Sequence, residues 1–137
     1  MTKHAIGSET FSLQLEIIRF DSDDFYPVDA ELLLAVSNGS FCGHSPFTAR
    51  VSELLAFGDQ LHTLYSTLEG KAVLREPSGS EQFLSFAACE RGYIRICGVL
   101  FSCDETGSNR FSFDTVVEQT YIGPFAASLQ KALRECL

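Results

Sequence analysis

The sequence lacks the motifs by which most enzymes and metal-binding proteins are recognised. Its 137 residues contain no tryptophan and three scattered histidines, His4, His44 and His62. Neither HxxxH nor CxxC spacing occurs, and no GxGxxG, GxxxxGK[ST] or GxSxG segment is present. These absences exclude the usual metal-ligand spacings, the phosphate-binding loops and the nucleophile elbow. We therefore expect no metal and no cofactor.

Positive charge is scarce. Ten Lys and Arg residues stand against eighteen Asp and Glu, which gives a net charge of −8. A surface of this charge repels phosphate backbones, so direct binding of DNA or RNA is not expected. The same charge favours a basic protein partner, although acidity by itself also keeps proteins soluble.

Long apolar runs are also missing. No stretch is long enough to span a bilayer, and the opening MTKHAIGSET contains no apolar signal-peptide core. The five cysteines are an odd number, and most of them lie within alternating apolar segments. We expect free thiols that pack as small buried hydrophobes. A cytoplasmic location fits this combination best.

The sequence does contain enough apolar material for a hydrophobic core. Hydrophobic residues make up 45% of the chain and include twelve phenylalanines. A chain of this length buries roughly two-thirds of its unfolded surface. Since no repeat, low-complexity tract or Pro/Gly-rich linker divides it, we expect a single domain over residues 1–137.

The hydrophobic periodicity predicts three strands, a helix, four strands and a second helix. Short connections between the strands favour antiparallel pairing. The expected fold class is therefore α+β: a curved antiparallel sheet of about six to seven strands with two helices packed on one face. Strands are expected at residues 11–17, 32–36, from 41 onward, 71–75, 82–89, 93–101 and around 111–113, and helices at 51–68 and from 122 onward.

Local sequence features place the ends of two of these elements. Asn38-Gly39 predicts a two-residue hairpin turn, because both positions tolerate positive φ. Ser52 is the expected N-cap of the first helix, and Gly70 is its expected left-handed stop.

Cys42 and His44 form the most enzyme-like pair in the sequence. At positions i and i+2 of a strand, their side chains point to the same face. A nucleophilic cysteine needs a base that a third group orients, and the sequence identifies no such group. A Cys42/His44 enzyme is therefore kept as a remote alternative. The favoured interpretation is a structural thiol beside an exposed histidine.

Two acidic loops are the candidates for binding a partner. One carries Asp21, Asp23 and Asp24, and the other carries Asp104 and Glu105. Turns favour aspartate for local hydrogen bonds, so both loops are expected to be solvated turns in the simplest interpretation. The functional interpretation is a docking patch whose carboxylates steer a basic protein towards the surface. The first loop lacks the glycine and the later glutamate that close a calcium site.

The segment Glu118-Gln119-Thr120-Tyr121 has the polar side chains of a catalytic cluster, but its position predicts a structural role. It lies between the last strand and the last helix expected from the sequence. Thr120 is suited to cap the amides that begin a helix, and Pro124 fits the first turn. We interpret the segment as a helix start and assign it no catalytic residue.

Six segments carry a resemblance to a known family. They are Ile18-Arg19-Phe20, Phe25-Tyr26-Pro27, Gly39-Ser40-Phe41-Cys42-Gly43, Gln60–Ala72, Gly92–Gly98 and Glu118–Ile122. On these segments the chain resembles the WapI-type immunity proteins, which neutralise polymorphic toxins secreted by neighbouring bacteria. That family typically has Asp-Gln-Thr-Tyr-Leu at the last segment, so Glu118 and Ile122 are conservative departures. It often has Asn-Trp-Leu where this chain has Ala30-Glu31-Leu32.

The resemblance implies a bacterial, cytoplasmic binding protein rather than an enzyme. The expected action is stoichiometric binding of a secreted toxin, and the expected partner is the basic C-terminal domain of that toxin. An acidic protein blocks such a domain by mimicking nucleic-acid charge or by covering an adjacent site. Nucleic acid and membrane are not expected partners. The alternative is a small-molecule or housekeeping interaction domain of the same fold.

Overall fold

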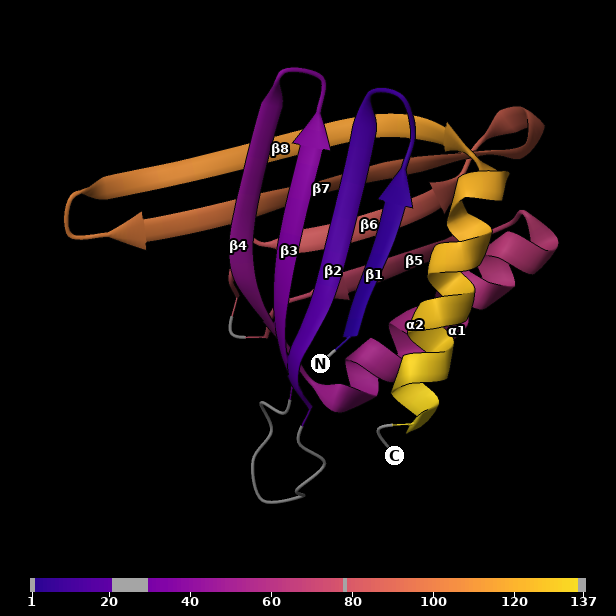
Figure 1. Ribbon diagram of the computed structural model, residues 1–137, viewed down its shortest axis with the longest axis horizontal. Coiled ribbons are helices and arrows are strands. Elements are labelled where there is room, and N and C mark those ends of the chain that lie inside the picture. Colours follow the sequence, from indigo (N-terminus) through magenta and orange to yellow (C-terminus); the bar gives the residue numbers. More distant parts are fainter. Residues whose placement is uncertain (1, 21–29, 78, 136–137) are drawn as a thin grey trace.

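The computed structural model describes residues 2–20, 30–77 and 79–135 of the chain, and these residues form eight strands and two α-helices (Figure 1). The first half comprises β1 (Thr2–Gly7), β2 (Phe11–Phe20), β3 (Ala30–Asn38), β4 (Phe41–Ala49) and α1 (Val51–Thr67). The second half repeats this order with β5 (Lys71–Arg75), β6 (Phe83–Ala88), β7 (Tyr93–Asp104), β8 (Gly107–Glu118) and α2 (Ile122–Glu135).

The strands form two four-stranded antiparallel sheets with the orders β1-β2-β3-β4 and β5-β6-β7-β8. Figure 1 shows that the strands of one sheet cross those of the other steeply, and that both helices lie along one side of the pair. On that side, α1 packs against β5, α2 packs against β1, and the helices pack against each other. At the opposite side, β4 is an edge strand that no helix covers.

The α+β class and the antiparallel pairing are confirmed, but the strands number eight and divide into two sheets. The helices close the side between the sheets and do not cover one face of a single curved sheet. The strand missing from the sequence prediction is β1. Its alternation is interrupted by His4, a polar residue at a buried position.

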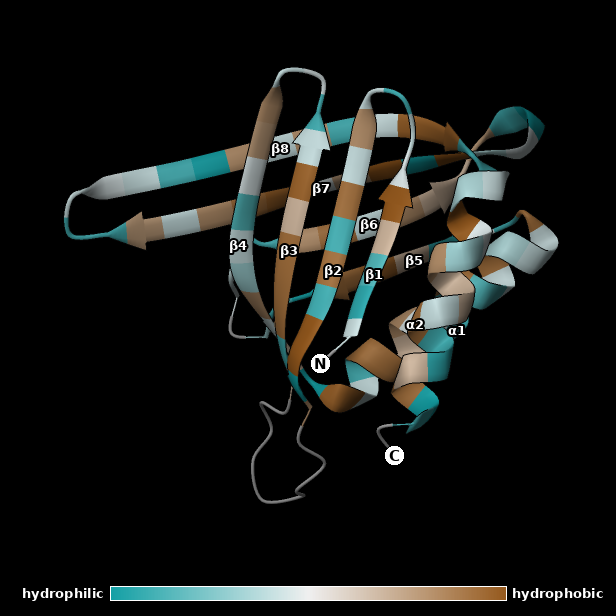
Figure 2. Cartoon of the chain, viewed as in Figure 1, coloured by the Kyte–Doolittle hydropathy of each residue, from teal (hydrophilic) through white to brown (hydrophobic). Residues whose placement is uncertain are grey.

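The hydrophobic core lies between the two sheets and under the helices. Side chains on β2 and β3 alternate between buried and exposed, and Figure 2 shows the same alternation as bands of colour along the strands. Phe86 of β6 joins the sheet to both helices: its ring centroid lies 5.8 Å from that of Phe57 in α1 and 5.9 Å from that of Phe125 in α2. Burying one such side chain stabilises the fold by about 1.5–3 kcal/mol.

The ends of β4 and α1 differ slightly from the sequence prediction. The predicted hairpin exists, but its two loop residues are Gly39 and Ser40, because Asn38 pairs with Phe41. The positive φ of Gly39, 63°, suits the first central position of a type II′ turn. The N-cap of α1 is Arg50, so the prediction of Ser52 was wrong. Likewise Leu68, and not Gly70, is the left-handed residue that ends α1.

His4 joins β1 to α2 through a buried hydrogen-bond chain. It is 4% exposed, its Nδ1 lies 2.7 Å from Ser128 Oγ, and its Nε2 lies 2.9 Å from Thr2 Oγ1. Burial lowers the pKa of His4 from its ordinary value of 6.5, because the charged imidazolium is poorly solvated there. The ring is therefore neutral at pH 7 and serves as a polar link within the core.

We expect the stability contributed by neutral His4 to be lost in mild acid. The unfolded chain binds a proton at His4 below about pH 6.5, whereas the folded chain resists it until the pH reaches the lowered pKa. The free energy of unfolding should therefore fall as the pH is lowered through this window. Urea unfolding at pH 7.5 and pH 5.5 checks this. His4→Gln should be less stable than the wild type at pH 7.5, and its free energy of unfolding should fall less between pH 7.5 and pH 5.5. An equal fall in both proteins would show that other groups cause the effect.

Candidate partner-binding site

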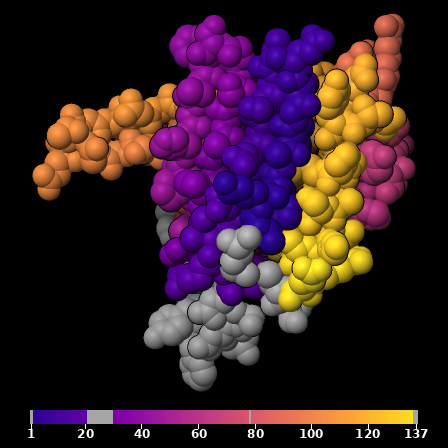
Figure 3. Space-filling model, viewed as in Figure 1, coloured from indigo at the N-terminus to yellow at the C-terminus, as the bar shows by residue number. Residues whose placement is uncertain are grey.

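The β7–β8 hairpin extends beyond the rest of the molecule as a two-stranded arm. β6 pairs with β7 only as far as Phe83 opposite Val99, whereas β7 and β8 pair up to Asp104 opposite Gly107. We call residues 100–111 the arm. Figures 1 and 3 show it projecting past β4, with residues 102–110 all exposed. An isolated two-stranded hairpin is at best marginally stable, so the arm depends on its base for its position.

The tip of the arm carries two of the predicted acidic residues. The Asp104 carboxylate accepts hydrogen bonds from Thr106 Oγ1 at 2.6 Å and from the backbone N–H of Thr106 at 2.8 Å and of Gly107 at 3.1 Å. These bonds, led by the one from the Thr106 side chain, lower the pKa of Asp104. Asp104 thus shapes the turn and stays ionised. Glu105 is exposed beside it. Asp21, Asp23 and Asp24 lie outside the residues that the structure describes.

The main-chain groups on the outer edge of β4 can be assigned from the hairpin geometry. A two-residue loop is closed by a hydrogen-bonded pair, here Asn38 and Phe41, and the pairs then alternate along the strands. The N–H and C=O groups that point away from β3 consequently belong to alternate residues. They are Cys42, His44, Pro46 and Thr48.

Half of this edge is capped by side chains. The N–H of Thr48 donates to Glu76 Oε2 at 2.8 Å, and the C=O of Pro46 accepts from Gln82 Nε2 at 3.0 Å. Pro46 has no N–H, so that position needs no acceptor. Among the described residues, no side chain makes a hydrogen bond to the main chain of Cys42 or His44. These two residues present an N–H and a C=O each at an open strand edge.

Gln82 holds the arm in place against β4. Besides its bond to Pro46, its Nε2 donates to Glu76 Oε1 at 2.9 Å, and its Oε1 accepts from the Phe101 N–H at 2.9 Å. Glu76 also accepts from Ser80 and from both the hydroxyl and the N–H of Thr48. Burial raises the pKa of Glu76, but these hydrogen bonds outweigh it, so the pKa is lowered. We call Glu76 and Gln82 the clasp.

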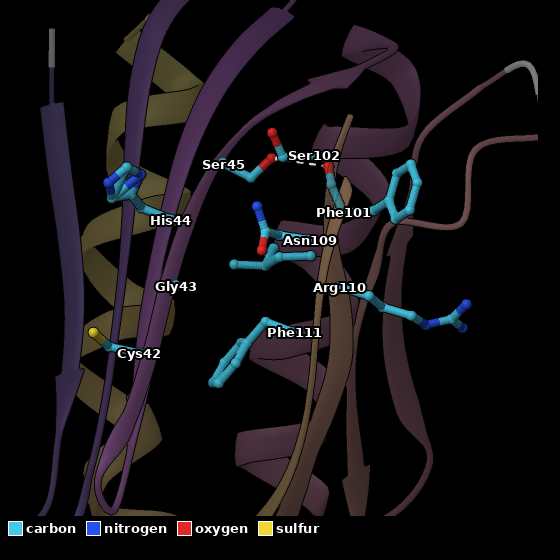
Figure 4. Close-up of a pocket in the computed structure, with 10 residues that line it drawn as sticks. Cys42, Gly43, His44, Ser45, Phe101, Ser102, Asn109, Arg110 and Phe111 are labelled. Carbon is cyan, nitrogen blue, oxygen red and sulfur yellow. Dashed lines mark hydrogen bonds between the residues drawn. The ribbon is translucent and has the colours of Figure 1, made fainter. Parts of the chain in front are cut away.

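A cleft of about 250 Å³ lies between the open edge of β4 and the arm. Figure 4 shows Ser45, Asn109 and Phe111 directed into this cleft, while Arg110 points away from it. Gly43 allows the close approach, because a Cβ there would lie 3.2 Å from Phe111 Cγ. Together with Leu100, these residues give the cleft an apolar floor and a polar outer rim.

Cys42 and His44 are neighbours on the outer face of the first sheet, and both are exposed. Figure 4 shows their side chains directed away from the cleft. They border a groove of about 380 Å³ whose other walls are mainly short side chains such as Ser12 and Ser37. Among the described residues, no side-chain hydrogen bond orients the His44 ring. The geometry places thiol and imidazole side by side and supplies no third group.

The expectation of buried cysteines was wrong for the part of the chain that the structure describes. Cys42, Cys89 and Cys103 are exposed, and Cys97 is half-buried. Cys42 and Cys97 occupy outward-facing positions of their strands, while Cys103 lies on the arm. Alternation alone does not say which of its two faces is covered.

The segment from Glu118 to Tyr121 joins β8 to α2. Glu118 is the last residue of β8, and Gln119–Tyr121 form a 3₁₀ turn that leads into Ile122. No side-chain cap is made at Glu118. Within the described residues, the Thr120 side chain makes no hydrogen bond, so the structure does not show the predicted Thr120 cap. Tyr121 is 40% exposed.

The described residues contain no group of three or more His, Cys, Asp or Glu side chains arranged to hold a metal ion. None of their helices has the length and apolar character needed to cross a membrane.

Several solved structures of low sequence identity share the fold. WHY3 from Arabidopsis thaliana superposes with a TM-score of 0.54 at 10% identity, covering 97% of this chain and 86% of its own. WHY1 from the same plant gives 0.54 at 12% identity, with 96% and 88% covered. The plant transcriptional regulator PBF-2 gives 0.54 at 10% identity, with 96% and 80% covered. At these identities the likeness shows the fold alone.

No curated protein matches the chain. A family model described as the Immunity protein WapI-like family does match, and it covers residues 4–136. The match includes both sheets, both helices and the arm. The chain therefore belongs to the Immunity protein WapI-like family.

Proposed function

We propose that this protein is a cytoplasmic immunity protein that neutralises a secreted bacterial toxin by stoichiometric, non-catalytic binding. The observation that carries the proposal is the family match over residues 4–136. The chain acts as one domain in this proposal, and its partner is the basic C-terminal domain of the toxin. Neutralisation requires only that the complex outlasts the exposure of the cell to the toxin, so no turnover is needed.

The arm is the part of the described surface best suited to such binding. Its residues 102–110 are all exposed, and Gln82 anchors its base to both β4 and β7. Its tip carries the carboxylates of Asp104 and Glu105 on a chain of net charge −8. Charges at the rim of an interface accelerate encounter with an oppositely charged partner and fix its orientation. A rigid base with an acidic tip supports capture of a basic toxin domain.

Co-expression with the C-terminal domain of the toxin encoded immediately upstream tests the proposal. We expect cells that produce this protein to survive the toxin domain, and the purified pair to form a complex of fixed stoichiometry by size-exclusion chromatography with light scattering. Cells carrying the empty vector provide the control. Lack of both rescue and complex formation would refute the proposal.

Reversing the charge at the tip should slow association. Glu105→Arg replaces an exposed carboxylate that no described side chain engages, so the fold should be unaffected. We expect the association rate constant for the toxin domain to fall about threefold to tenfold at low salt and the difference to shrink as salt is added. Glu69→Arg makes the same charge change after α1, away from the arm, and is the matched control. Surface plasmon resonance measures both, and equal rates for the two variants would exclude steering by the tip.

A further inference from the structure

Beside the open edge of β4, and over the arm, there is space for one additional strand. The two sheets differ in width, because the arm carries the second sheet past β4 while the first sheet ends there (Figure 1). A fifth strand beside β4 would lie about 4.8 Å from it and directly over the arm. It would extend the first sheet to match the second.

We propose that the toxin binds by adding an extended segment to the edge of β4, at Cys42 and His44, over the inner face of the arm. This inference rests on the proposed function and names the way in which the partner is held. An added strand satisfies the N–H and C=O groups that these two residues present outward. The remainder of the edge is closed, since Glu76 and Gln82 already occupy Thr48 and Pro46.

Within the described part of the chain, the edge also lacks the features by which proteins prevent unwanted strand pairing. Natural edges are blunted by lysine, by proline or by a covering element. The segment Phe41–Ser45 contains no Asp, Glu, Lys or Arg residue. The nearest proline, Pro46, follows the two open positions, Cys42 and His44. Phe41, at the start of this edge, is 73% exposed, the highest value among the large hydrophobic residues of the described chain. Phe41 therefore places apolar surface next to the open main-chain groups, where an added strand would cover it.

The arm defines the side chains that the added segment should carry. Gly43 of β4 lies against Phe111, so β4 already covers the pair Leu100 and Phe111 on the inner face. The next inward-facing pair along the arm is Ser102 and Asn109, both exposed. A small polar residue such as serine, threonine or asparagine fits over them and exchanges hydrogen bonds.

Two exposed side chains near the edge complete the description of the partner segment: Phe41 at the start of β4 and Glu105 at the tip of the arm, which projects sideways from β4. An apolar residue of the segment would pack on Phe41 at one end. A lysine or arginine would lie towards Glu105, which is exposed at the arm tip. The segment is therefore short, extended and mixed in character, with one apolar, one small polar and one basic side chain.

Two pairs of variants test strand addition with the toxin domain as the probe. His44→Pro removes one outward N–H while leaving the bonds to β3 intact, as the natural Pro46 does two residues later. His44→Ala keeps that N–H and is its control. Asn109→Trp fills the inner face of the arm, and Ser108→Trp places the same bulk on the outer face as its control.

We expect His44→Pro and Asn109→Trp each to weaken binding about tenfold or more by isothermal titration calorimetry. Both controls should bind within about threefold of the wild type, and circular dichroism should show all four variants folded. If the wild type binds and all four variants bind equally, strand addition is refuted and the proposed function stands. If the wild type does not bind, both fail. The protein alone should also be tested for self-association. If it forms a stable dimer that His44→Pro dissociates, the β4 edge binds a second copy of the chain, and the inference is refuted.

Discussion

Replacing Gln82 with leucine should lower the free energy of unfolding by about 2–4 kcal/mol. The side chain is 4% exposed and makes three hydrogen bonds, to Pro46, Glu76 and Phe101. Leucine is similar in size but leaves the Phe101 N–H without its acceptor and removes one of the hydrogen bonds to the Glu76 carboxylate. Each buried polar group left unpaired costs about 1–3 kcal/mol. The bond to Pro46 links the sheets, so its loss also loosens the base of the arm.

Urea unfolding followed by circular dichroism measures this effect. Gln14→Leu is the matched control, because Gln14 is exposed on the outer face of β2, and its replacement should change stability by about 0.5 kcal/mol or less. If Gln82→Leu were as stable as the control, the clasp would not contribute to the fold. We also expect Gln82→Leu to weaken toxin binding more than its loss of stability explains, because the arm is no longer fixed beside β4.

Gly98→Ala should be at least as damaging, at about 3 kcal/mol or more. Gly98 lies in β7 beside β6, and a Cβ added there would lie 2.4 Å from the Phe83 carbonyl oxygen and 2.8 Å from Phe113 Cζ. The first of these atoms belongs to the backbone of a paired strand, so the sheet itself must shift. Overpacking of this kind is relieved only by displacing β6 or the Phe113 ring.

Gly7→Ala makes the same change without the clash. Nothing lies within 4 Å of a Cβ at Gly7, so its stability should stay within about 0.5 kcal/mol of the wild type. Thermal unfolding of both variants at the same pH provides the comparison. Equal midpoints for Gly98→Ala and Gly7→Ala would show that β6 and β7 are less closely packed than the structure indicates.

Much of the local structure was predictable because buried apolar residues recur in the sequence at the spacing of a strand or a helix. The alternation from Phe11 to Ile17 identified β2, and the spacing of apolar residues in α1 gave a helix within one residue of its observed ends, Val51 and Thr67. β1 was missed since His4 satisfies its ring nitrogens inside the core, where a sequence pattern expects an apolar residue. The periods identify buried faces, but they do not show that the faces of two sheets meet.

The candidate site was less predictable, for a physical reason. Residues 102–110 are exposed on both faces, so this part of β7 and β8 shows no alternation, and the sequence prediction ended the strand at Phe101. The clasp was missed because Glu76 and Gln82 act on residues far along the chain. The one signal available was the acidic pair Asp104 and Glu105, which marked the turn and therefore the tip of the arm.

The arm and the open edge of β4 respond differently to sequence change. Side chains can diversify along the arm without disturbing the core, since residues 102–110 contact solvent on both faces. The main-chain groups of Cys42 and His44 stay constant whatever those side chains are. In the proposed binding mode, a fixed backbone edge beside an arm whose side chains can change would let one fold recognise different toxins, with specificity set by a few attractive or repulsive contacts.

Amide hydrogen exchange of the complex tests the central claim most directly. Exchange should be measured residue by residue with NMR, for the protein alone and with the C-terminal domain of the upstream-encoded toxin. We predict that the amides of Cys42 and His44 exchange quickly in the free protein and become strongly protected in the complex. Gly43, which already bonds to β3, should change little. Complex formation that leaves Cys42 and His44 unprotected while other surfaces slow would contradict the account.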